Sequence, residues 1–174
     1  MQHDLERSIE VLSRTPATLR AMLGGLPEAW SHANYGPDTF SPFDVVGHMI
    51  HGERTDWMVR LHWIREKGAR EAFPPYDRFA QARESRGKTL AMLLDEFEGL
   101  RRANLAELAG LRLAEEDYDA RGLHPTLGAV TLRELLATWV VHDLNHVAQI
   151  AKALAFQYKD EVGPWRAFLP ILPR

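Results

Sequence analysis

The sequence contains no cysteine among its 174 residues, and this absence removes several kinds of chemistry at once. Without thiols the chain forms no disulfides, offers no thiolate to a metal ion and has no cysteine nucleophile. Any thiol that takes part in a reaction must therefore arrive with a second substrate.

The sequence also lacks long apolar runs and any concentration of charge of one sign. No apolar run approaches the roughly 20 residues that cross a bilayer, and Met1–Arg7 has no apolar core of a signal peptide. The net charge is −3, and the short basic clusters at Arg83–Lys88 and Arg101–Arg102 are interpreted as solvated helix faces. We therefore expect a soluble cytoplasmic protein that binds neither nucleic acid nor membrane.

The apolar residues follow a helical period nearly throughout, with no convincing pair of strands joined by a hairpin turn. A length of 174 residues and a hydrophobic fraction of 45% suit a single globular domain over residues 1–174. Long helices without strands predict an all-α fold, a four-helix bundle. The expected helices cover about 3–24, 41–68, 85–109 and 131–158, joined by long connections at 25–40, 69–84 and 110–130.

Local signals set several helix boundaries. Pro16 lies inside the first helix, and because proline removes a helical hydrogen bond we expect a break at Thr15-Pro16. Ser41 followed by Pro42 is typical of a helix start, with serine as the N-cap. Thr131, with a glutamate three residues later, predicts a capping box at the start of the last helix.

His142 and His146 stand four residues apart in the last helix, so their imidazoles project from the same face. A third imidazole from a neighbouring helix would complete a three-nitrogen site with room for water, as in many catalytic zinc sites. His48 and His51 lie on a facing stripe of the second helix, and spacing alone does not choose between them. Asp44, one turn before His48, can accept the other ring N–H of that histidine, which favours His48.

These residues resemble the DinB/YfiT-like superfamily. The matching stretches are Val46–Arg54 and the pattern His142-x-x-x-His146-x-x-Gln149-Ile150, and the resemblance extends to Thr15-Pro16 and the tail at Val162–Arg166. It implies a four-helix bundle in up-down-down-up order, commonly a homodimer. It also implies a divalent metal bound by one histidine of the second helix and a histidine pair of the fourth.

Carried over by position, the implied metal ligands are His48, His142 and His146. The resemblance does not imply one reaction, because some members are thiol-dependent S-transferases or isomerases and others resemble metal-dependent hydrolases. The first interpretation is thus a metal-dependent hydrolase or thiol S-transferase that acts on a small electrophile, with a low-molecular-weight thiol as candidate cosubstrate. Zinc or nickel is the expected ion, with iron or manganese as alternatives.

Other interpretations remain open at this point. A non-catalytic metal-binding bundle of stress-associated or sensory type is the main alternative, and a helical interaction module without metal is another. No proton acceptor is assigned; the candidates are Asp44, His51 and Glu53. An interhelical salt bridge explains Glu53 equally well, and His51 is expected beside the site rather than as a fourth ligand. The Asp143-x-x-His146 element of di-iron bundles has no second copy here, which excludes that site.

Overall fold

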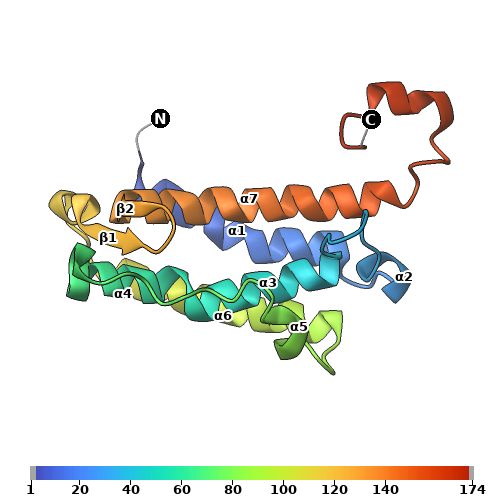
Figure 1. Ribbon diagram of the computed structural model, residues 1–174. Coiled ribbons are helices and arrows are strands. Elements are labelled where there is room, and N and C mark those ends of the chain that lie inside the picture. Colours follow the sequence, from blue (N-terminus) through green and yellow to red (C-terminus); the bar gives the residue numbers. More distant parts are fainter. Residues whose placement is uncertain (1–2, 173–174) are drawn as a thin grey trace.

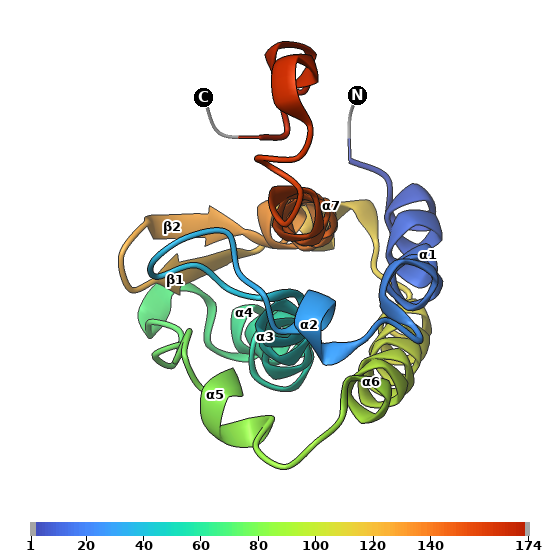
Figure 2. The same cartoon turned by 90° about the vertical axis from the view of Figure 1, so that its right-hand side faces the viewer.

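Four long helical segments run side by side in the structure, a computed structural model that describes residues 3–172 (Figure 1). They are α1, the consecutive helices α3 and α4, α6 and α7, with bounds Leu5–Leu23, Pro42–Thr55, Trp57–Lys67, Leu90–Gly110 and Leu132–Phe156. Seen along their length, the four segments are arranged around a common axis (Figure 2). The predicted four-helix bundle is confirmed.

Shorter elements occupy the connections between these helices. They are α2, the 3-10 turn η1, α5, the 3-10 turn η2, strands β1 and β2, and the 3-10 turn η3, with bounds Glu28–Ser31, Gly68–Arg70, Gln81–Glu84, Glu115–Asp119, Arg121–His124, Gly128–Thr131 and Gly163–Phe168. The turn η1 contacts β1, whereas α5 contacts α3. Residues 71–80 therefore run along the outside of α4 and α3 to reach α5 (Figure 1).

The helix starts agree with the local sequence signals. Ser41 accepts a hydrogen bond from the Asp44 backbone N–H, and the Asp44 carboxylate accepts one from the Ser41 backbone N–H at 3.0 Å. Thr131 and Glu134 form the same reciprocal pair at the start of α7. Both capping boxes satisfy N–H groups that a helix end otherwise leaves unpaired, so these boundaries are set locally.

Helix α1 runs unbroken through the buried Pro16, so the expected break at Thr15-Pro16 is wrong. Proline has no N–H to donate to the carbonyl four residues earlier, which belongs to Leu12. The Arg101 Nη1 donates to that Leu12 carbonyl at 2.9 Å. A buried side chain from another helix thus replaces the missing helical hydrogen bond, and α1 continues.

Strands β1 and β2 form an antiparallel hairpin within the connection 110–130, where we expected no paired strands. Each strand has four residues, which is too short for a clear alternating pattern. A Cβ atom added at Gly122 would lie 2.7 Å from both Ile64 Cγ1 and Phe73 Cζ, so this glycine allows the hairpin to pack closely on α4. Gly128 adopts a φ of 79° at the turn, which favours glycine.

Arg101 is buried at the centre of the bundle, with 1% of its surface exposed, while Arg102 is exposed. The expectation of a solvated face is therefore wrong for Arg101. Its guanidinium donates to Asp143 of α7 at 2.5 and 3.0 Å and to Glu53 of α3 at 2.7 Å. Arg101 lies on the inward face of α6 together with Phe97 and Leu105, which explains its burial.

This ion network separates two apolar clusters of the core. One cluster joins α4, the C-terminal half of α6 and the start of α7 around Trp57, Leu108 and Leu132. The other packs α3 against the start of α6 and the end of α7, around Val46, Phe97 and Ile150. In the described part of the chain, every helix is too short or too polar to cross a membrane.

We predict that Arg101→Met lowers the free energy of unfolding by about 3–5 kcal/mol, because Glu53 and Asp143 then remain buried without their counter-ion. Urea unfolding followed by circular dichroism measures the change. The matched control is Arg102→Met on the exposed neighbour, which should change the same quantity by no more than about 0.5 kcal/mol. Equal stability of the two variants would contradict the role of Arg101.

Candidate metal centre

Three histidines converge between α3 and α7. The His142 Nε2 lies 3.4 Å from the His48 Nε2 and 3.0 Å from the His146 Nε2. One nitrogen from each ring can be chosen so that all three lie within 4.8 Å of one another. The one-turn spacing of His142 and His146 on α7 and the packing of α3 against that helix produce the convergence.

Burial lowers the pKa of all three imidazoles below the ordinary value of 6.5. The pKa of His48 falls to about 4 and that of His142 to about 2, and for both the neighbouring His146 ring adds to the effect of burial. All three rings are thus neutral near pH 7. Neutral imidazole is the form that donates an electron pair to a metal ion.

The spacing of the nitrogens suits a metal ion. Zinc–nitrogen bonds of about 2.0–2.1 Å in a tetrahedral arrangement hold neighbouring nitrogens about 3.3 Å apart. The two observed Nε2–Nε2 separations, 3.4 and 3.0 Å, bracket that value. Three imidazoles also form a donor set that suits zinc, nickel, copper and iron. The residues present therefore fit a divalent ion.

Polar neighbours orient two of the rings. The His146 Nδ1 lies 2.8 Å from the Gln149 Oε1, a contact in which the ring N–H donates and Nε2 is left free. The Gln149 amide in turn donates to the Tyr35 hydroxyl at 3.5 Å. The Tyr76 hydroxyl lies 3.4 Å from the His48 Nδ1. Such contacts to the second ring nitrogen commonly accompany metal-binding histidines.

The third ring, His142, is held by aromatic packing. Its edge meets the Trp57 ring at a centroid distance of 5.0 Å, and Trp57 stacks on Trp139 at 5.5 Å. The Trp139 Nε1 donates to Glu53 at 3.2 Å, so this stack is tied to the Arg101 network. The His142 Nδ1 is buried and finds no hydrogen-bond partner within residues 3–172.

The structure gives each proton-acceptor candidate a partner. Both hydrogen bonds to the Asp44 carboxylate come from Ser41, and the group beside the His48 Nδ1 is Tyr76 rather than Asp44. Glu53 accepts hydrogen bonds from Arg101 at 2.7 Å and from the Asn104 amide at 3.0 Å, which is the interhelical salt bridge weighed from the sequence.

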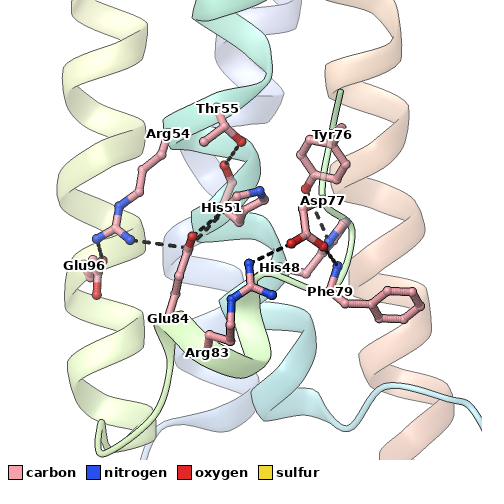
Figure 3. Close-up of polar contacts among 10 residues, drawn as sticks. All are labelled: His48, His51, Arg54, Thr55, Tyr76, Asp77, Phe79, Arg83, Glu84 and Glu96. Atoms are coloured by element: carbon pink, nitrogen blue, oxygen red, sulfur yellow. Dashed lines mark hydrogen bonds and ion pairs between the residues drawn. The ribbon is translucent and has the colours of Figure 1, made fainter. Parts of the chain in front are cut away.

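His51 lies beside the site and is engaged elsewhere. Its Nδ1 lies 3.1 Å from both carboxylate oxygens of Glu84, and its ring packs on Tyr76 at a centroid distance of 5.1 Å (Figure 3). Glu84 also pairs with Arg54 at 3.6 Å. These contacts bind α5 to α3.

Residues 71–84, which we call the covering segment, carry two site residues that sequence reasoning missed, Tyr76 and Arg78. The segment has no helical period that could reveal them. Gly47 explains how closely it approaches: a Cβ atom there would lie 2.5 Å from the Ser85 Oγ and 3.2 Å from the Gln81 Cβ. The glycine that precedes His48 therefore allows α5 to pack directly on α3.

A cavity of about 680 Å³ adjoins the histidines. Its walls come from the loop before α3, the covering segment and α7, and both His48 and His146 form part of its lining. The volume falls in the range of small-molecule sites, roughly 300–1,000 Å³. A small molecule in this cavity would thus reach the point where the imidazoles converge.

Comparisons with known proteins agree with the sequence resemblance. A family model described as the DinB superfamily matches residues 12–150. Among solved structures, the chain is similar to YfiT from Bacillus subtilis, with 22% sequence identity, a TM-score of 0.72 and coverage of 91% of this chain and 87% of that one. YfiT is described as a probable metal-dependent hydrolase with an unusual four-helix bundle topology. A search of curated proteins gives no match. The likeness to YfiT shows a shared fold.

We predict that the metal-free protein loses stability as the pH falls from 6.5 toward 4. The pKa values of His48 and His142, about 4 and about 2, lie below the ordinary value, so in this window the unfolded chain takes up protons that the folded chain does not. His142→Asn removes one such group and should reduce the loss at pH 4 by on the order of 2 kcal/mol. Urea unfolding at several pH values, with a chelator present, measures this. Parallel curves for the two proteins would contradict the prediction.

Proposed function

The chain belongs to the DinB superfamily, and from this premise we propose that it is a metal-dependent enzyme whose divalent ion is bound by His48, His142 and His146. The observation that carries the proposal is the convergence of three neutral, half-buried or buried imidazoles, two of which, His48 and His146, line a cavity. Zinc or nickel is the first candidate ion, with iron or manganese as alternatives.

The arrangement favours a catalytic site over a structural one. Structural zinc sites are usually closed by four protein ligands, whereas catalytic sites have three and an open position. The nearest further histidine, His51, is engaged by Glu84, and no fourth His, Cys, Asp or Glu joins the cluster in the described part of the chain. Two of the three histidines, His48 and His146, line the cavity, so a molecule there would reach an ion held by the cluster, which supports catalysis over the non-catalytic alternative.

A divalent ion bound there supplies Lewis-acid chemistry toward an electrophilic substrate or its nucleophile. The chain's own residues hold the imidazoles neutral and oriented through Gln149 and Tyr76, and form the cavity that admits the substrate. The reaction class is transfer of a nucleophile to a small electrophile. Hydrolysis is the first candidate, since it needs no second organic substrate and YfiT is described as a probable hydrolase. Thiol S-transfer is the alternative, with the thiol supplied by a cosubstrate.

We expect zinc- or nickel-loaded wild-type protein to retain about one ion per chain after desalting, and the His48→Ala and His142→Ala variants to lose it. Gln149→Ala, which frees the His146 ring, should weaken affinity about tenfold or more. Elemental analysis and competition with a chelator measure both effects. His62→Ala is the matched control, because His62 pairs with Glu107 outside the cluster. Full metal retention by His142→Ala would contradict the site.

Turnover is the second part of this test. Metal-loaded wild type is incubated with a panel of activated esters and amides, and separately with a small electrophile and a low-molecular-weight thiol. The proposal predicts turnover in one arm that disappears in His142→Ala. Tight metal binding without turnover in either arm would favour the non-catalytic alternative.

We also propose that the protein forms a homodimer through the outer face of α7. Val141 and Leu144 on that face are 64% and 54% exposed, and Trp165 and Phe168 in the tail are 71% and 81% exposed. The tail stands away from the bundle on the same side as α7 (Figure 2). Exposed apolar side chains gathered on one side of a molecule typically mark a protein–protein contact.

The double substitution of Val141 and Leu144 by glutamate should convert the dimer to a monomer, because it places charge in the apolar contact. Light scattering coupled to gel filtration measures the mass. Ala106→Glu adds charge to an exposed position of α6 and serves as the control. A wild-type protein that is monomeric at micromolar concentration would contradict the proposed dimer, but it would not bear on the proposed metal site.

A further inference from the structure

We propose that Arg78 anchors the substrate, and that the substrate carries a carboxylate group which pairs with its guanidinium. This assignment rests on the proposed metal-dependent function, because it concerns the same cavity. Arg78 lines that cavity together with His48 and His146. One molecule can therefore contact the guanidinium at one end and reach the convergent imidazoles at the other.

Within the described residues, Arg78 has no charged partner of its own. Among residues 3–172 no carboxylate forms an ion pair with it, and its contact is with the Phe79 ring, 5.2 Å from the ring centroid. The neighbouring carboxylate of Asp77 is taken by Arg83 at 2.7 Å. By contrast, Arg54 and Arg60 nearby both have carboxylate partners. A cation on a cavity wall without a protein counter-ion is available to a ligand.

The covering segment holds Arg78 in place. The Asp77 carboxylate accepts hydrogen bonds from Arg83 and from the Phe79 backbone N–H at 3.0 Å, which fixes the turn on both sides of Arg78 (Figure 3). Further along the segment, Glu84 is bound to His51 on α3. An arginine whose backbone is fixed and whose guanidinium lies on an aromatic ring loses less conformational freedom when it binds a ligand.

The remaining walls define the rest of the ligand. Phe79, with 57% of its surface exposed, meets Phe40 edge to face at a centroid distance of 6.3 Å, and both rings line the cavity. They form an apolar surface between Arg78 and the histidines. The expected substrate is therefore a small molecule with a carboxylate, a short apolar body and an electrophilic group at the metal end.

The charges favour a carboxylate over a phosphate. The planar guanidinium matches a carboxylate through two parallel hydrogen bonds. Asp38, from the loop before α3, lines the same cavity and carries the opposite charge to Arg78. A carboxylate carries the single charge that the Arg78 guanidinium balances, whereas a dianionic phosphate carries one charge more than this side chain neutralises.

Cobalt-loaded protein and matched thiol probes test this assignment. The probes are mercaptoalkanoic acids of increasing chain length and their neutral amides, whose sulfur binds cobalt and produces a thiolate-to-cobalt absorption band. At one or more chain lengths, wild type should bind the acid about tenfold or more tightly than the amide. Arg78→Gln should lose this preference while keeping its cobalt content. Arg86→Gln is the control, because Arg86 is exposed and lies outside the cavity lining.

The outcomes separate failure of the anchor from failure of the proposed function. Acids and amides that give the cobalt band with equal affinity in wild type would overturn the anchor and leave the metal site standing. A preference lost equally in Arg78→Gln and Arg86→Gln would also overturn it, since the effect would then be general charge attraction. Wild type that takes up no cobalt would instead overturn the proposed metal-dependent function.

Discussion

The guanidinium of Arg101 meets one group from each of the other three long segments of the bundle: the Leu12 carbonyl of α1, the Glu53 carboxylate of α3 and the Asp143 carboxylate of α7. A buried charge is strongly unfavourable without its partners, so sliding any one helix past Arg101 would leave a charged or polar group unpaired. The network therefore selects one register of the bundle. It also lets α1 pass through Pro16, because the carbonyl that proline leaves free is bound by the arginine.

The metal centre depends on that register. Asp143 directly follows His142 on α7 and stands three residues before His146. Its ion pair with Arg101 therefore sets the rotation of α7 that turns both histidines toward α3. Glu53 accepts a hydrogen bond from Trp139, whose stacking with Trp57 seats the His142 ring. The same burial that keeps the imidazoles neutral is interrupted on one side by the cavity. A catalytic metal site requires ligands that are shielded from water and held in place, and one side of the site that a substrate can reach.

The features that were predicted from the sequence are those that depend on local spacing. The bundle follows from apolar periodicity, the starts of α3 and α7 from capping boxes, and the pairing of His142 with His146 from a one-turn step. The features that were missed depend on contacts between distant segments. Pro16 is tolerated inside α1 because Arg101 binds the carbonyl that the proline leaves free. Arginine is usually exposed, and nothing in the local sequence indicates that two carboxylates from other helices bury this one. Tyr76 and Arg78 lie in a segment without periodicity, and four-residue strands are too short to show alternation.

The central claim is that three histidines bind one divalent ion and leave a position open to the cavity. X-ray absorption at the metal edge of zinc-loaded protein tests it most directly, since the outer-shell scattering of imidazole rings can be counted. The account predicts three imidazoles at about 2.0–2.1 Å and one further light ligand that an added thiol replaces with sulfur at about 2.3 Å. A site closed by four protein ligands that no thiol enters, or zinc bound without imidazole scattering, would contradict it.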